Sequence, residues 1–441
     1  MKSIRSLLFV ALVAVPAAAQ PPGEAQPQPQ TQTLTLARAI ELALQQQPSI
    51  RQQQANVEAA RGRVDQAKVI RKPTVTLNGT VAARSTQGGF VNGVADPSGG
   101  FFDPFYSTGL SGNISYRIYD FGLTKANIRA AEANAEAVAA GTGTTTLDVQ
   151  TNVAVAYLEA VARQRLISVA EATVVSEDAH LDQARRFVAA QAKDPIEQVQ
   201  AQARASTARS TLAQAHSDAA TSLAVLRQTM GLLDPMVAIA VAPEWPGTPA
   251  GDPSTLVALV EEARQHRPEI VQLDKQILAA EASVDAARAG SRPVLSAGAT
   301  MQWNPTQNDW SPDPTWNAGL TLSWPIYDGG RAKADTRVAR ANLTGVLAQR
   351  DALLVSLTSE LDAARARIVA NRANVTASTE AVNAARAQLQ LAEARYKQEI
   401  GSQIELADAQ TAVTTAEGNL ISAEWQLATS WVQLRRALGA L

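Results

Sequence analysis

The amino-acid sequence predicts a mainly α-helical protein with a β-barrel part, built from two structural repeats. The chain repeats itself at a nearly constant spacing, and each copy contains two short stretches of alternating apolar and polar residues. Between these stretches lie long proline-free segments with heptad periodicity. Alternation with a period of two is typical of strands, and heptads are typical of helices that pack side by side. Each copy is therefore expected to hold two membrane-crossing strands and long coiled-coil helices.

Composition excludes several classes of protein. The chain has 441 residues, of which 39 are Lys or Arg and 41 are Asp or Glu, and it has no cysteine. A near-neutral chain lacks the basic excess that nucleic-acid binding needs, so no nucleic-acid partner is expected. Without cysteine there is no disulfide framework, no thiolate metal site and no lipidated cysteine, so no lipid anchor is expected either.

Catalytic motifs are absent from the sequence. The three histidines, His180, His216 and His266, are scattered, and the chain contains no HExxH, GxSxG or P-loop pattern. Carboxylates are numerous, but their coiled-coil spacing indicates solvated helix faces. We therefore predict that the protein is not an enzyme and has no catalytic, cofactor or metal site.

The first residues are typical of an export signal. Lys2 and Arg5 precede an apolar run from Leu7 to Val15, and small residues follow up to Ala19, where cleavage is expected. Residues 1–19 are therefore predicted to be a signal peptide, and residues 20–33, rich in Pro and Gln, a disordered leader. The apolar run is too short to span a bilayer, which takes about 20 residues. Periplasm, outer membrane and medium remain as destinations.

An internal duplication organises the rest of the chain. Early landmarks recur 220 positions later and later landmarks recur 208 positions later. The first group is Thr35, Leu36, Pro48 and Ile50, which recur as Thr255, Leu256, Pro268 and Ile270, and the second is Tyr119, Asp120 and Gly122, which recur as Tyr327, Asp328 and Gly330. The difference of 12 places a longer loop in the first copy. The predicted repeats are residues 34–231 and 254–441, joined by a Pro-rich linker, 232–253.

The alternating stretches predict strands at about 74–84 and 107–119 in the first repeat, and at about 293–303 and 315–327 in the second. Each is close to the length of about 9–11 residues that crosses a membrane obliquely, and the polar set is uncharged except for Arg117. A soluble antiparallel sheet explains the alternation equally well. Aromatic residues at the strand ends favour the membrane, because interfacial girdles lie there: Tyr116, Tyr119, Phe121, Trp303, Trp316, Trp324 and Tyr327.

Four strands cannot close a barrel, and an open edge in hydrocarbon leaves backbone groups unpaired at several kcal/mol each. The chain is therefore expected to oligomerise, with 8, 12 or 16 strands for two, three or four copies, and composition does not choose among these. The loops 84–107 and 304–315 are expected on the cell exterior.

The predicted helices are about 123–190 and 195–230 in the first repeat, and 331–398 and 402–438 in the second. At ~1.5 Å per residue the longer ones reach ~100 Å. The segment 331–398 carries one heptad seam through Leu357, Leu361 and Ile368, and a second, alanine-rich seam about 200° away. A helix with two seams needs a neighbour on each side, as in a wall that closes into a tube. The segment 141–146, rich in Gly and Thr, predicts a local kink.

In this order the features resemble the TolC-type outer-membrane efflux protein family. The similar residues are the segment 34–44 with 48–50, the junctions 119–122 and 327–330, and Arg395, Tyr396, Ser402, Glu405 and 408–410. The resemblance implies a homotrimer with a 12-stranded β-barrel continuous with a 12-helix α-barrel. It implies an outer-membrane exit duct with a periplasmic helical extension, working with a periplasmic adaptor and an inner-membrane pump in a tripartite efflux or type I secretion system.

The resemblance also suggests functional residues at the helix turns far from the strands. Glu405 and Asp408 match the acidic constriction of the family, where a trimer would place two rings of three carboxylates that favour cations; ordinary solvated charges are the alternative. Tyr396 and Glu197 resemble a pair that holds the periplasmic mouth shut. The residues expected to face the adaptor are Ala190, Gln191, Ile400, Gly401 and Ser402.

Two readings without a pore remain at this stage. A periplasmic adaptor also carries a long helical hairpin, but only one, flanked by β-rich domains. A fibrous coiled-coil protein would explain the heptads without the strands. Neither accounts for two hairpins that alternate with Thr- and Ser-lined strands.

Overall fold

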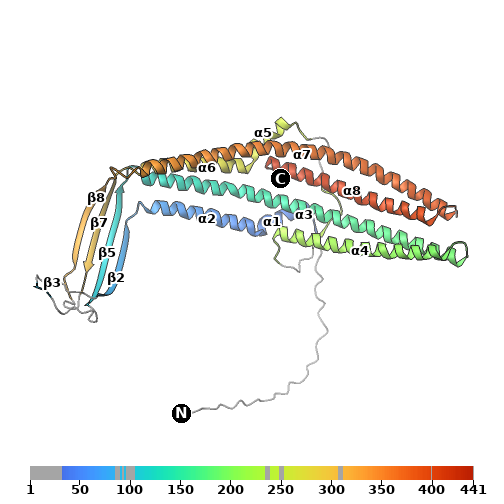
Figure 1. Cartoon of the computed structure of the whole chain (residues 1–441), viewed down its shortest axis with the longest axis horizontal. Coiled ribbons are helices and arrows are strands. Elements are labelled where there is room, and N and C mark those ends of the chain that lie inside the picture. The colour runs from blue at the N-terminus through green and yellow to red at the C-terminus, as the bar shows by residue number, and fades with distance from the viewer. Residues whose placement is uncertain are drawn as a thin grey trace, which may run out of the picture.

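The computed structural model describes residues 32–84, 90–91, 94–95, 105–233, 239–247, 253–305, 311–398 and 400–440. The predicted signal peptide and nearly all of the predicted leader lie outside these residues. The molecule is an elongated rod with a sheet at one end and helices along the rest (Figure 1). This confirms a mainly α-helical class with a smaller β part.

The sheet has four antiparallel strands in the order β2-β5-β7-β8. Their bounds are β2 Thr74–Arg84, β5 Phe105–Tyr119, β7 Val294–Trp303 and β8 Thr315–Ser323. Two very short strands, β3 (Phe90–Val91) and β4 (Val94–Ala95), pair within the loop that joins β2 to β5. The outermost strands, β2 and β8, each have one edge without a partner strand in the described chain.

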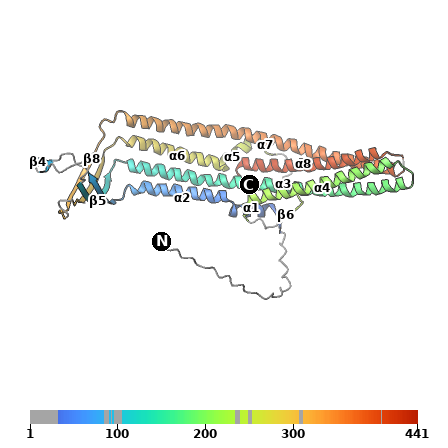
Figure 2. The same cartoon turned by 60° about the horizontal axis from the view of Figure 1, so that its bottom comes forward.

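Long helices form a single layer that continues from the sheet (Figure 2). α3 (Leu123–Ala189) and α7 (Arg331–Lys397) run its full length, about 100 Å at 1.5 Å per residue. In the half near the sheet the order is α2 (Pro48–Val69), α3, α6 (Pro268–Ala289), α7. In the far half, α4 (Pro195–Met230) and α8 (Gln403–Leu438) take the places of α2 and α6. None of the described helices is both long and apolar enough to cross a bilayer.

Two glycines allow the shorter helices to stack end to end. Gly231 ends α4 at φ +74°, and a Cβ there would lie 2.8 Å from Cα of Gln47, just before α2. Gly439 ends α8 at φ +82°, and its Cβ would lie 2.8 Å from Cα of Arg267, just before α6. A left-handed backbone and a contact this close both require glycine. The duplication therefore reappears as two equivalent junctions.

Two short helices cover these junctions, and each is followed directly by a new helix. α1 (Leu36–Gln46) and α5 (Leu256–His266) each bury two side chains against the long helices, and both end before the proline that begins α2 or α6. Next to α1, β1 (Gln32–Leu34) pairs in parallel with β6 (Ile239–Val241) of the linker. Gln32 and Thr33 are thus ordered by strand pairing, which corrects the leader expected to run to residue 33.

The Tyr-Asp motifs lie where the strands end and the long helices begin, and they cap those helices. Asp120 accepts hydrogen bonds from the backbone N–H of Gly122 (3.2 Å) and Thr124 (2.8 Å), and Asp328 accepts from Gly330 (2.9 Å) and Ala332 (2.8 Å). Burial alone would raise the pKa of Asp120, but the hydrogen bonds from Thr124 and Gly122 and the charge of Arg117 outweigh it and lower the pKa. Each motif therefore supplies acceptors for N–H groups that a helix start leaves unpaired.

The glycine- and threonine-rich segment 141–146 does not interrupt α3, which is assigned as one helix from Leu123 to Ala189. Gly141 is buried, and a Cβ on Gly143 would lie 3.0 Å from Cβ of Pro268 at the start of α6. The hydroxyl groups of Thr145 and Thr146 donate to carbonyls one turn back (3.3 and 2.9 Å). The small residues allow α6 to approach α3 closely at this point.

Candidate functional site

The two helix turns farthest from the sheet lie together at one end of the rod (Figure 1). The first joins α3 to α4 and the second joins α7 to α8. Both use the same closure, because N–H of Ala192 donates to the carbonyl of Phe187 (2.9 Å) and N–H of Ile400 to that of Arg395 (3.1 Å). We call the described residues 187–197 and 395–405 the distal tip.

Tyr396 joins the two turns. Its side chain is 1% exposed, and its hydroxyl donates to a carboxylate oxygen of Glu197 at 3.2 Å. The ring meets Phe187 edge-on at 5.8 Å, and the amine of Lys193 lies 5.8 Å from the ring centre. Burial and the negative charge of Glu197 raise the pKa of Tyr396 to about 12. The phenol therefore remains a hydrogen-bond donor at any physiological pH.

Glu405 and Asp408 lie in the first two turns of α8 and differ in their surroundings. Glu405 completes the cap of α8, since its N–H donates to Oγ of Ser402 (3.1 Å), and its carboxylate pairs with Arg395 at 3.1 Å. Asp408 is exposed and has no ion pair within the described part of the chain. Of the two carboxylates expected from the sequence, Glu405 is thus neutralised by Arg395 and Asp408 is not neutralised.

The remaining tip residues follow the same two turns. Ala190 and Gln191 are exposed, and Gln191 has a left-handed backbone, φ +61°, where glycine is more usual. Ile400 is 68% exposed. Gly401 is buried, and a Cβ there would lie 3.0 Å from the backbone nitrogen of Tyr396, so a larger residue would have to displace that backbone. Glu399, also in the second turn, lies outside the described residues.

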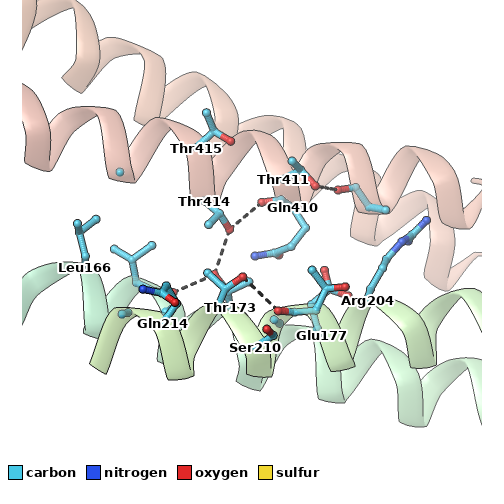
Figure 3. Close-up of a pocket in the computed structure, with 18 of the residues that line it drawn as sticks. Leu166, Thr173, Glu177, Arg204, Ser210, Gln214, Gln410, Thr411, Thr414 and Thr415 are labelled. Carbon is cyan, nitrogen blue, oxygen red and sulfur yellow. Dashed lines mark hydrogen bonds between the residues drawn. The ribbon is translucent and has the colours of Figure 1, made fainter. Parts of the chain in front are cut away.

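A polar groove of about 770 Å³ runs behind the tip between α4 and α8, with α3 as its floor (Figure 3). Thr173 of α3 and Thr414 of α8 bond across it at 3.0 Å. Glu177, on the α3 floor of the groove, is 7% exposed. Burial raises its pKa, and the charge of Arg204 partly offsets that effect. Arg204 also donates to the carbonyl of Gln403 (3.1 Å), which ties α4 to α8.

Sequence reasoning missed Glu177 and Arg204. A signal was present, because Glu177 occupies a seam position of α3 with the 3-4 spacing of Ile167, Ala170, Leu181 and Ala184, all of which are buried. A carboxylate at a seam position is buried and needs a cationic neighbour. That neighbour is on α4, and no local pattern identifies it.

Comparison with known proteins identifies this architecture. The sequence profile described as outer membrane efflux protein matches residues 39–232 and 259–440, which is most of the chain. The chain belongs to the outer membrane efflux protein family. The two matched segments fall in the two repeats and leave out the linker between them.

Relatives of this outer membrane efflux protein cover nearly its whole length. Protein CyaE of Bordetella pertussis is 29% identical over 408 residues, 91% of this chain and 83% of the relative. Outer membrane protein OprJ of Pseudomonas aeruginosa is 26% identical over 423 residues, with the same coverage. The crystal structure of outer membrane protein VceC of Vibrio cholerae has the same fold, with a TM-score of 0.73 at 21% identity, covering 92% of this chain and 96% of that one.

Family membership settles the broad class and the location. The chain is an outer-membrane efflux channel protein, its sheet lies in the outer membrane, and its helices extend into the periplasm. The family comprises channel and transport proteins, not enzymes. The readings as a periplasmic adaptor or as a fibrous coiled coil are not supported. Among the described residues, no group of three or more His, Asp or Glu side chains could hold a metal ion.

Proposed function

We propose that three copies of the chain form one exit duct, in which 12 strands close a barrel and 12 helices in cross-section close a tube. The observation that carries this proposal is that the layer has two free edges. β2 and β8 each lack one strand partner in the described chain. The alanine seam of α7, including Ala366, Ala373 and Ala387, is exposed on the flank away from its neighbours. Another copy would satisfy both edges.

The duplication predicts how the edges meet. Within one chain, Asn113 of β5 faces Thr300 of β7, and Oγ1 of Thr300 lies 2.7 Å from Oδ1 of Asn113. The position 208 after Asn113 is Thr321 in β8, and the position 220 before Thr300 is Thr80 in β2. If the duplication continues across the subunit boundary, Thr321 of one copy faces Thr80 of the next.

We propose that the distal tip is the periplasmic mouth and that the Tyr396–Glu197 contact favours its closed state. The contact joins the tip of the first repeat to that of the second, so the two turns cannot separate while it is made. Opening the tube at this end requires such a separation.

Conductance of the purified channel in planar bilayers tests the mouth. Y396F removes the hydroxyl and should raise the open probability severalfold, since one net hydrogen bond contributes about 1 kcal/mol. Y157F is the matched control, because Tyr157 is equally buried and its hydroxyl donates to the carbonyl of Leu34 (2.9 Å) far from the tip. Equal effects of the two variants, or no effect of Y396F, would reject this role.

The same recordings test the acidic constriction. We propose that Asp408 sets most of the cation preference, since Arg395 neutralises Glu405. D408A should reduce the preference for cations more than E405A does. A larger loss in E405A would show that the Arg395 ion pair is not kept in the assembled channel.

We further propose that a periplasmic adaptor contacts the exposed residues of the tip and that an inner-membrane pump supplies the energy. A photo-crosslinking residue at Ile400 should give an adduct that mass spectrometry identifies as an adaptor. The matched position is Val257 in α5, which is 81% exposed but far from the tip. Adaptor adducts at Val257 and none at Ile400 would overturn the placement.

A further inference from the structure

The helix ends next to the sheet are strongly basic, although the whole chain is not. Four windows of 13 residues cover these helix ends together with the residues that join them to the strands: 61–73, 120–132, 281–293 and 328–340. Together they hold 13 Lys and Arg against 7 Asp and Glu, a net charge of +6 in a chain of net charge −2. The rest of the chain is therefore at −8. Positive charge is concentrated where the helices leave the membrane.

In the second repeat four of these cations meet at one groove of about 710 Å³. It lies between the end of α6 and the start of α7, and its cations are Arg288, Lys333, Arg337 and Arg340. Arg288 has an exposed ion pair with Asp285 at 3.4 Å. The other three have no carboxylate at ion-pair distance among the residues that the structure describes. Asp328 is the one carboxylate in the lining, and it accepts hydrogen bonds from the backbone at the start of α7, so four cations against one anion leave the groove strongly positive.

The groove adjoins the exposed apolar side chains of β8 and of the residues that follow it. Along β8 and the residues after it, apolar side chains at even-numbered positions are 60–85% exposed: Trp316, Leu320, Leu322, Trp324 and Ile326. Ile326 and the neighbouring Tyr327 line the basic groove. Across α7, the groove on its other face is lined by Ala, Asn, Ser and Val with a single charge, Asp335. Outward apolar side chains of a membrane strand face lipid, so the cations adjoin the end of a row of side chains suited to lipid contact.

The first repeat has a weaker version of the same cluster. The positions equivalent to Arg288, Lys333 and Arg337 are Lys68, Lys125 and Arg129, all basic. The fourth position, Arg340, corresponds to Glu132, and Glu132 pairs with Lys68 at 3.0 Å. The cluster thus occurs at both sheet-to-helix junctions. In the first repeat Glu132 partly neutralises it, whereas the second repeat has Arg340 at that position.

From this arrangement we propose that the groove of the second repeat binds the phosphate headgroup of an anionic phospholipid in the periplasmic leaflet of the outer membrane. Guanidinium groups form paired hydrogen bonds with phosphate oxygens. Basic clusters next to an apolar membrane surface attract anionic headgroups. Trp324, Ile326 and Tyr327 supply the apolar and aromatic contacts for the start of the acyl chains. A neighbouring copy would cover the opposite flank of α7, so it leaves this groove open.

Lipid selectivity at a tryptophan tests the proposal, because Trp324 directly follows β8 beside the groove. The full-length channel with Trp324 as its only tryptophan is reconstituted in phosphatidylcholine, and brominated phosphatidylglycerol or brominated phosphatidylcholine is added as quencher. Phosphatidylglycerol should compete at least about fivefold better, the factor that one cation near a charged bilayer contributes. A channel with Trp303 alone, at the other end of the sheet, should show no preference.

Two variants decide which residues are responsible. R288Q/K333Q/R340Q should abolish the preference at Trp324, whereas R51Q/R264Q/R365Q, which removes three exposed cations far from the sheet, should keep it. R340E should reproduce the ion pair of the first repeat and lower the preference severalfold. Native mass spectrometry of the unmodified channel gives a second readout, retained phosphatidylglycerol that is lost in the groove variant.

The proposal fails if phosphatidylglycerol and phosphatidylcholine quench Trp324 equally, or if the groove variant keeps the preference. It also fails if Trp324 shows no preference while the channel sediments with isolated peptidoglycan through the same three cations, because the surface then binds the cell wall. Bilayer conductance of the groove variant should be unchanged, so this result is separate from the tests of the duct.

Discussion

The two helix junctions at the middle of the rod share one backbone design and differ in their side chains. In the second repeat, Arg267 is 5% exposed and contacts Glu360 at 2.8 Å and Glu269 at 3.3 Å. Arg436 extends the cluster with a hydrogen bond of 2.7 Å to Asp148 of α3. In the first repeat the positions equivalent to Arg267, Glu360, Glu269 and Arg436 hold neutral residues, in the same order Gln47, Asn152, Ser49 and Gln228. There a single hydrogen bond joins Gln47 to the carbonyl of Thr229 (2.9 Å).

This difference shows which part of the junction the fold requires. Both repeats have a glycine at this position, Gly231 in the first and Gly439 in the second, because the end of one helix meets the backbone of the residue that precedes the next helix. The polar groups around that contact differ in how fully they are paired: the ion-pair cluster pairs Arg267 with two carboxylates, whereas the neutral junction makes the Gln47 hydrogen bond and leaves the buried Oγ of Ser49 without a partner among the described residues. The ion pairs add a connection to α3 of the first repeat through Asp148, which the neutral junction lacks.

The shared feature should give the largest effect. G231A and G439A each force an L-residue into a left-handed backbone and place its Cβ about 2.8 Å from a Cα. We expect each to lower the free energy of unfolding by about 2–4 kcal/mol. Thermal unfolding in detergent, followed by circular dichroism, measures this. G345A, in α7 with open space around it, is the control and should be neutral or slightly stabilising.

The differing feature should give a smaller effect that is unequal between the repeats. R267M removes the nearer cation from Glu360 and Glu269 and leaves them only Arg436, at 3.8 and 3.7 Å. It should cost about 2–3 kcal/mol, less than for a fully buried pair because Glu360 is 40% exposed. Q47M loses one hydrogen bond and should cost about 1 kcal/mol. Equal shifts in the two variants, measured by the same unfolding experiment, would mean that the ion-pair cluster adds nothing over the neutral junction.

The two helix caps next to the sheet, at Asp120 and Asp328, should give the smallest difference in stability between the repeats, and it should be seen at acid pH. The pKa of Asp120 and that of Asp328 are both lowered in the folded protein, the latter by hydrogen bonds from Ala332 and Gly330. A lowered carboxylate pKa stabilises the fold above the unfolded value near 4, and that stabilisation is lost as the pH falls below it. D120A should cost about 1–2 kcal/mol at pH 7 and flatten the acid dependence. D328A should do so less, since Asp328 is exposed. A larger acid effect in D328A would contradict this order.

Local patterns in the sequence identified much of this fold. The heptad spacing located the buried seam of α7, where Leu357, Leu361 and Ile368 are fully buried. The alternating stretches coincide with the four strands of the sheet to within a few residues, since β5 begins at Phe105 and not near 107, and β8 ends at Ser323 and not near 327. Resemblance to the family singled out Tyr396 and Glu197, which are in contact. Periodicity and motif carry these features, because each depends on residues close together in the chain.

Features that depend on contacts between distant segments could not be predicted. The sequence marks Gly141 and Gly143 as poor helix formers, but it does not show that they lie against Gln272 and Pro268, more than 120 residues away. Glu177 needs Arg204 of another helix, and Arg395 neutralises Glu405 across a turn. A single sequence shows these residues but not their partners.

Closure of the duct by three copies is the central claim, and one disulfide tests it most directly. The chain has no cysteine, so T80C/T321C can form only the designed bond. Oxidation of outer membranes that contain this variant should give a ladder that ends at a covalent trimer, and T80C/L322C should not, because adjacent strand residues point to opposite faces. Monomer alone, or a ladder ending at two or four copies, would contradict the account.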